Sequence, residues 1–145
     1  MDTQQYANWQ APCPNAGKYE IKVEFAENWV GTNPDANGEV STGMKFIYEI
    51  VGPPEAMMDN KTSAIGYKFD ELLLEPKQSS SAKYVEMCSQ KWNHQLHACF
   101  GDQIPATVLP EDFLDRVFVA TAKPKFDDFK QKNIPNLGWR GPLGS

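Results

Sequence analysis

The chain has 145 residues and a mass of 16.3 kDa, the size of one ordinary domain that can bury a core without disulfides or metals. Hydrophobic residues make up 41% and charged residues 23%, and these proportions exclude global disorder and fibrous repeats. The formal net charge of -5 by itself disfavours nucleic-acid binding, because phosphate contacts need lysine and arginine.

The basic residues are concentrated near the C-terminus. Residues 116–145 carry six basic and two acidic side chains, a balance of +4. Residues 1–115 therefore carry eight basic and 17 acidic side chains, a balance of -9. The sequence predicts a bipolar molecule with one local basic patch, which the total charge conceals.

The cysteines and the N-terminal residues indicate the cellular compartment in which the protein works. The three cysteines are odd in number and form no CxxC pair, so a disulfide framework is not expected. The N-terminus lacks the basic start and the apolar stretch of a signal peptide, and no apolar run approaches the roughly 20 residues of a membrane helix. We expect a cytoplasmic protein with no membrane partner. Residues 141–145 resemble an expression-vector remnant.

The first half of the chain predicts strands. After a polar extension or arm, residues 1–16, polar and apolar side chains alternate along residues 18–25, as in a half-buried strand. Turn-forming residues at 31–38 predict a long loop, and residues 44–51 alternate again. Residues 63–74 predict a third strand, with a bulge near Asp70-Glu71. The apolar face of the first strand would carry Tyr19, Ile21, Val23 and Phe25.

One helix follows these strands. Serines 79–81 can cap its start and Gly101 its end. The apolar side chains between them fall within an arc of roughly 160°, so this face should lie on the sheet. They are Tyr84, Val85, Cys88, Trp92, Leu96, Cys99 and Phe100.

The last elements complete a recognisable order. After a loop at 102–112, residues 116–123 predict a fourth strand, residues 123–132 a loop or hairpin tip, and residues 134–139 a weak fifth strand. Three strands, one helix and two strands is the element order of the OB-fold, a five-stranded Greek-key barrel. We therefore predict a mainly β, OB-fold-like domain over residues 17–139, followed by a C-terminal tail at 140–145.

No catalytic or metal-binding pattern stands out. Cys88, His94, His97 and Cys99 offer zinc-type ligands, but on a helical wheel His97 lies about 180° and His94 about 240° from Cys88. One ion cannot gather all four, so we interpret the cysteines as buried apolar side chains. The chain has no Gly-x-Ser-x-Gly and no glycine-rich phosphate loop. We expect no enzyme, no metal and no cofactor.

The strongest local constellation is the segment from residue 123 to residue 132. Its side chains suit a single strand, since cations follow phosphates and flat rings stack on bases. We expect one of its two phenylalanines to stack and the other to turn back onto the core. The segment contains Lys123, Lys125, Phe126, Phe129, Lys130 and Lys132.

The position of this segment supports the same function. In an OB-fold the loops between strands 1 and 2 and between strands 4 and 5 flank a ligand face on strands 2 and 3. The lysine-rich segment is the second of these loops. Lys45, Tyr67 and Lys68 lie on the intervening strands, and Trp29 enters the first loop, either as a lid on the core or as a stacking platform.

From about residue 17 to residue 136 the chain resembles a phage-encoded family of single-stranded-DNA-binding proteins with an OB-fold. The likeness is one of order and spacing. The segments that carry it are GKYEIKVEF at 17–25, KFIYEIVGP at 45–53, ACFG at 98–101, FVATAKPK at 118–125, and Asn133-Ile134.

The resemblance implies a protein that coats single-stranded DNA in phage replication or recombination, without sequence preference, in the host cytoplasm. Replication or recombination proteins would be its partners. Many proteins with this role carry an acidic C-terminal tail for recruiting such partners, whereas residues 136–140 here are not acidic. RNA binding and homo-oligomer formation stay open. The alternative function is a structural β-barrel or β-sandwich protein of a virus particle, or an interaction module, in which Tyr6 and Trp9 form an arm.

Overall fold

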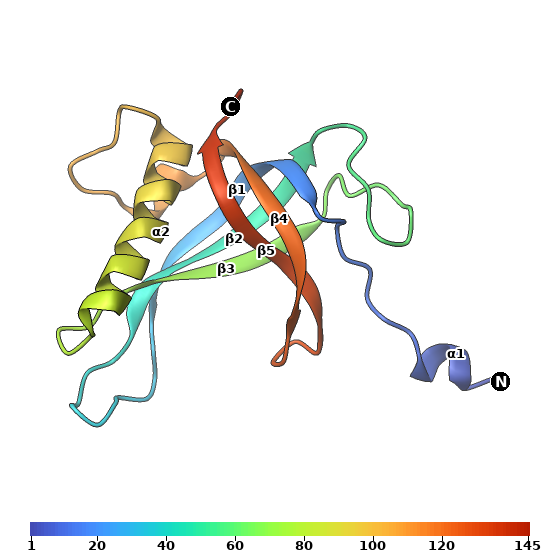
Figure 1. Ribbon diagram of the computed structural model, residues 1–145, viewed down its shortest axis with the longest axis horizontal. Coiled ribbons are helices and arrows are strands. Elements are labelled where there is room, and N and C mark those ends of the chain that lie inside the picture. Colours follow the sequence, from blue (N-terminus) through green and yellow to red (C-terminus); the bar gives the residue numbers. More distant parts are fainter.

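The computed structural model describes all 145 residues and contains five strands and one long helix (Figure 1). A single-turn helix lies near the N-terminus, and a short 3-10 helix precedes the fourth strand. The elements are α1 (Gln4–Ala7), β1 (Gly17–Val30), β2 (Thr42–Gly52), β3 (Lys68–Glu75), α2 (Ala82–Phe100), η1 (Pro110–Phe113), β4 (Val117–Asp127) and β5 (Lys132–Pro142).

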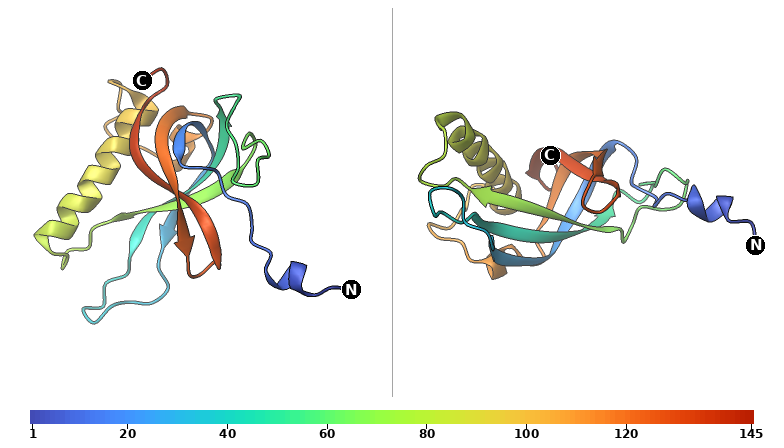
Figure 2. Two further views of the ribbon diagram at one scale, coloured as in Figure 1. Left: turned by 45° about the vertical axis from the view of Figure 1, so that its right-hand side comes forward. Right: turned by 90° about the horizontal axis from the view of Figure 1, so that it is seen from below.

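The five strands form one antiparallel sheet in the order β3-β2-β1-β4-β5. The fourth strand returns beside the first, which is the Greek-key arrangement. The sheet curls into a small barrel that is open between its two edge strands, β3 and β5 (Figure 2). The predicted OB-fold-like, mainly β class is confirmed.

The core fills the inside of this barrel with aromatic side chains. Phe46 and Tyr48 on β2 are completely buried, and Phe113 of η1 packs edge-on against Phe46 with 5.1 Å between ring centroids. Phe118 on β4 meets Tyr48 in the same way at 5.6 Å. Phe100 at the end of α2 packs on Phe113, so the helix and η1 together cover one side of the barrel. Such edge-to-face contacts are the favoured geometry for aromatic rings.

A bulge in β1 changes which side chains face the core. The pairing of β1 with β2 shifts between Val23 and Phe25, so the alternation moves by one residue. Tyr19, Ile21 and Val23 are buried as predicted, but Phe25 is 43% exposed and Ala26 is buried in its place. The prediction that Phe25 faces the core is therefore wrong.

The third strand is shorter than predicted. β3 begins at Lys68 and pairs with β2 in an unbroken register, so the predicted bulge at Asp70-Glu71 is absent. Residues 63–67 form a turn in which the Tyr67 amide donates to the Ala64 carbonyl and Gly66 has a φ of +88°. A positive φ is a conformation that glycine adopts at little cost, which explains why the chain turns here instead of extending.

The helix α2 follows its predicted limits closely. The Ser81 hydroxyl accepts a hydrogen bond from the Tyr84 amide, and Gly101, with a φ of +62°, ends the helix. Cys88 and Cys99 are buried whereas His94 and His97 are exposed, which is the separation that the helical wheel predicts. Burial raises the pKa of the Cys99 thiol to about 12. No helix of the structure is long and apolar enough to cross a membrane.

The last strand extends beyond its predicted end. β5 runs to Pro142, Arg140 is buried, and Lys18 Nζ donates to the Ser145 carbonyl at 2.6 Å. The predicted boundary between a domain at 17–139 and a tail at 140–145 is therefore wrong. β4 is also longer than predicted and reaches Asp127, so only residues 128–131 form the hairpin tip.

Candidate nucleic-acid interface

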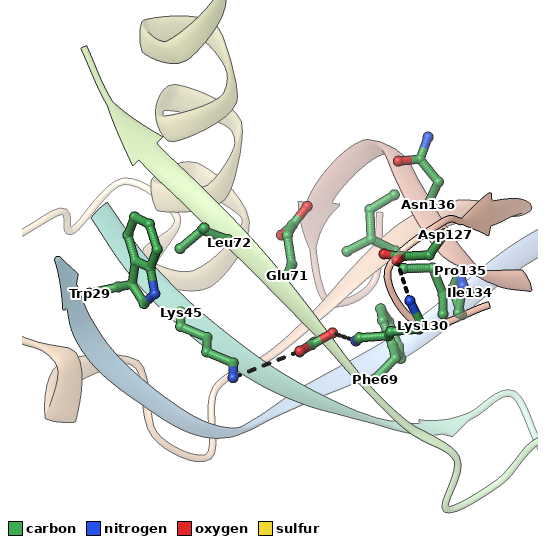
Figure 3. Close-up of a pocket in the computed structure, with 12 residues that line it drawn as sticks. Trp29, Lys45, Phe69, Glu71, Leu72, Asp127, Lys130, Ile134, Pro135 and Asn136 are labelled. Atoms are coloured by element: carbon green, nitrogen blue, oxygen red, sulfur yellow. Dashed lines mark hydrogen bonds and ion pairs between the residues drawn. The ribbon is translucent and has the colours of Figure 1, made fainter. Parts of the chain in front are cut away.

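A cleft of about 360 Å³ lies at the open seam of the barrel (Figure 3). One wall comes from the ends of β1 and β2 and from β3, with Trp29, Lys45 and Leu72. The opposite wall comes from the β4–β5 hairpin, with Lys130 and Ile134. The cleft lies where β3 and β5, the two edge strands of the sheet, do not pair with each other.

The bulge in β1 places Trp29 in this cleft. Beyond the bulge, odd-numbered residues of β1 face outward, and Trp29 pairs with Gly43 of β2. A Cβ atom at Gly43 would lie 2.2 Å from the Leu73 carbonyl oxygen, so the backbone of β3 approaches closely at this point. Trp29 is half-buried and lies outside the core cluster. Trp29 lines the cleft instead of closing the core, and its role as a stacking platform stays a prediction.

Two lysines of the cleft share one carboxylate. Lys45 Nζ lies 3.9 Å from Asp70 Oδ2, and Lys130 Nζ is paired with Asp70 Oδ1 (dashed lines in Figure 3). The Lys130 amide also donates to Asp127 Oδ1 at 2.8 Å, which fixes the hairpin tip. Asp70 thus holds the hairpin to β3 across the seam and partly neutralises both lysines.

The β4–β5 hairpin carries the remaining basic residues. Lys123 pairs with Asn136 and Lys125 with Ile134 in the register of the two strands, so these two lysines lie next to one another on one face. Neither they nor Lys132 form an ion pair with a carboxylate. The hairpin therefore presents three uncompensated positive charges.

Both phenylalanines of the hairpin are exposed. Phe126 is 54% exposed and Phe129, at the tip, is 95% exposed. The prediction that one of the two turns back onto the core is wrong. The two strands extend to Asp127 and from Lys132, so Phe129 lies in a short tip of residues 128–131 and not in a longer loop that could fold back.

Two predicted site residues lie outside the cleft. Tyr67 packs against the core and stacks on Phe69, with ring centroids 6.2 Å apart, and burial raises the pKa of its hydroxyl. Lys68 Nζ pairs with Glu24 at 2.9 Å on the outer face of the sheet. The hydrogen bond from Lys68 lowers the pKa of the Glu24 carboxyl. The structure does not bring Tyr67 and Lys68 into the cleft with Trp29, Lys45 and Lys130, and their role in binding stays a prediction.

The structure also contains a buried polar network beside the cleft. Arg140 of β5 donates through Nη1 to Glu71 Oε1 of β3 at 2.7 Å, and its Nη2 bonds the second oxygen of the same carboxylate. Nη1 also donates to Gln95 Oε1 at 2.6 Å, and the Tyr48 hydroxyl donates to Glu71 Oε1 at 2.7 Å. Gln95 Nε2 donates to the Tyr48 hydroxyl at 3.0 Å. This network joins the two unpaired edges of the sheet.

The groups of this network stabilise one another in their ordinary protonation states. Burial opposes the charge on Arg140, but the hydrogen bond and negative charge of Glu71 outweigh it, and the pKa of Arg140 is raised. Burial, with the adjacent Glu71 charge, raises the pKa of the Tyr48 hydroxyl well above its usual range, so Tyr48 stays protonated as a donor. The one signal of this network in the sequence is Gln95, a polar residue inside the apolar arc of the helix.

Comparison with known proteins gives no relative. No family model matches the chain, and neither a curated protein nor a solved structure shows significant similarity to it.

Proposed function

We propose that the protein binds single-stranded DNA without sequence preference and without catalysing a reaction. The observation that carries this proposal is the β4–β5 hairpin, which carries two exposed phenylalanines and three lysines without an ion pair, next to the residues that line the seam cleft. Exposed aromatic rings of this size are unfavourable in water unless a ligand covers them. A base covers a ring by stacking, while its phosphate is drawn to a lysine.

Each part of the interface has a separate task in this proposal. Phe126 and Phe129 stack on bases, and Trp29 receives a further base inside the cleft. Lys123, Lys125 and Lys132 accompany the phosphates. None of these contacts reads the edge of a base, because stacking and phosphate contacts are common to all nucleotides. The expected binding is therefore tolerant of sequence and sensitive to salt.

The carboxylates of the cleft support binding over catalysis. Asp70 is paired with Lys45 and Lys130, Glu71 is paired with Arg140, and Asp127 Oδ1 accepts a hydrogen bond from the Lys130 amide. A general acid or base must instead be available to a reacting group. We further propose, on the sequence resemblance to phage single-stranded-DNA-binding proteins, that this activity serves phage replication or recombination in the host cytoplasm.

Phe129→Ala tests the stacking role. We expect the affinity for oligo-dT to fall by about five- to 150-fold, the range for loss of one stacked base. The melting temperature should not change, since Phe129 is almost fully exposed. Fluorescence anisotropy of labelled oligo-dT measures the affinity, with Leu143→Ala as a control for an exposed apolar side chain at the other end of the hairpin strands. Wild-type affinity in Phe129→Ala would remove this residue from the interface.

Asp70→Asn tests whether the shared carboxylate limits binding. The substitution removes the negative charge that holds Lys45 and Lys130, so we expect several-fold tighter binding of oligo-dT at low salt and a steeper loss with salt. Glu24→Gln is the matched control, because it releases Lys68 outside the cleft. Equal gains in the two variants would show that only the net charge matters and that the cleft is not the binding site.

Large regular assemblies in light scattering, together with no binding of oligo-dT, would support the structural alternative instead. The observation that favours this alternative is the N-terminal arm, on which Tyr6 and Trp9 are exposed.

A further inference from the structure

A second hollow, of about 500 Å³, lies between the N-terminal segment and the β4–β5 hairpin. Trp9 lines it from one side and Phe126 from the other, and Lys130 and Lys132 complete its basic wall. No carboxylate lines it, whereas the seam cleft contains Asp70, Glu71 and Asp127. Of the two hollows, this one therefore has the more positive surroundings.

The N-terminal segment is attached to the barrel a few residues after Trp9. The Cys13 amide donates to Asp59 Oδ1 at 3.2 Å, and the Asp59 amide donates to the Cys13 carbonyl at 2.9 Å. Pro14 forms a bridge with Met58, and the Asn15 amide donates to the Met57 carbonyl at 3.1 Å. Because these contacts hold residues 13–15 on the barrel, the few residues between Cys13 and Trp9 keep Trp9 close to the hairpin.

The views agree on this arrangement. The N-terminal segment leaves the barrel and runs down on the same side as the hairpin tip in Figure 1 and in the left view of Figure 2. Trp9 is 67% exposed although it faces this hollow. A large indole ring held at a basic hollow and left uncovered has the chemistry of a stacking platform.

We propose that Trp9 and Phe126 form a second base-stacking site, which extends the path of a single strand from the seam cleft onto the N-terminal segment. This inference rests on the proposed function. Lys130 lines both hollows, so one phosphate beside Lys130 connects the two sites. Lys132, which forms no ion pair, receives the next phosphate. The N-terminal segment is then a part of the DNA-binding surface.

The test combines affinity with a direct probe of Trp9. Binding of oligo-dT of about 4 and about 16 nucleotides, the range of site sizes for one OB-fold, is measured for the full-length wild type, Trp9→Ala and Tyr6→Ala. Tyr6 is the matched control, because it is 63% exposed on the same segment and does not line the hollow. The protein is also labelled with 5-fluorotryptophan, and its ¹⁹F resonances are assigned by replacing each tryptophan with phenylalanine.

We expect Trp9→Ala to lower the affinity for the long oligonucleotide by about five- to 150-fold and to leave that for the short one nearly unchanged. Tyr6→Ala should bind both as the wild type does. The Trp9 resonance should shift on addition of the long oligonucleotide, while that of Trp92, whose indole N–H is bonded to the Leu74 carbonyl inside the fold, stays in place.

Three results would overturn the inference and leave the proposed function intact. They are wild-type affinity of Trp9→Ala for the long oligonucleotide, an unmoved Trp9 resonance at saturation, and an equal loss of affinity for both lengths. A change of molar mass in Trp9→Ala, with oligo-dT affinity unchanged, would assign the segment to contacts between copies and would also overturn it. A wild type that binds neither oligonucleotide would overturn the proposed function itself.

Discussion

Arg140→Ala is expected to lower the free energy of unfolding by about 3–5 kcal/mol, the usual cost of removing one partner from a buried ion pair. Glu71 would keep its charge beside β3 without the guanidinium, and Gln95 Oε1 would lose its donor. The effect is large because β3 and β5 are not paired, and Arg140 and Glu71 form the more buried of the two ion pairs that cross the seam. Urea unfolding followed by circular dichroism measures the change.

The double variant Arg140→Met, Glu71→Leu separates loss of a pair from loss of packing. Replacing a buried ion pair by apolar side chains of similar volume is often neutral, so we expect this variant to be much more stable than Arg140→Ala. Removing the exposed pair of Lys68 and Glu24 should leave the melting temperature nearly unchanged. Wild-type stability of Arg140→Ala would contradict the view that the network closes the barrel.

Simultaneous replacement of Lys123, Lys125 and Lys132 by alanine is expected to have the largest effect on binding. These lysines form no ion pairs, so their full charge is available to phosphates. Each lost phosphate contact makes the slope of log K against log salt less negative by about 0.7 for a single strand. Three contacts therefore change the slope by about 2 and lower the affinity at low salt by two to three orders of magnitude.

The control for this variant removes three other lysines. Lys61, Lys83 and Lys91 are exposed, form no ion pairs and line neither hollow, so their replacement by alanine changes the net charge equally. Anisotropy titrations over a series of salt concentrations give both slopes. If the two triple variants lose the same affinity and the same slope, then the hairpin is not the contact surface and only the total charge of the protein matters.

Local patterns in the sequence predict most of the elements but not their exact phase. Alternation predicts β1 and β2, and Ser81 and Gly101 mark the ends of α2. The bulge after Val23 is invisible in the sequence, because it depends on the pairing with β2. β5 contains Pro135, Gly138 and Gly141, which are poor strand formers, so its full length depends on the pairing with β4.

In the candidate site too, local sequence patterns predict some features, and other features depend on the tertiary structure. The lysines and phenylalanines of the hairpin are neighbours in the sequence, and the prediction brings them together correctly. The pairing of β2 with β3 brings Lys45 near Asp70, and the curling of the sheet brings Lys130 to Asp70 and Arg140 to Glu71, so these contacts depend on the tertiary structure. The hollow shared by Trp9 and Phe126 is also not predictable from the sequence, because the two residues are far apart in the chain.

We propose that this acidic protein binds single-stranded DNA through a basic hairpin. Titration of the wild type with labelled oligo-dT at about 50 and about 200 mM salt tests it most directly. We expect submicromolar binding at the lower concentration and a steep loss at the higher one, since lysine–phosphate contacts release counterions. An absence of binding at the lower salt concentration would contradict the account.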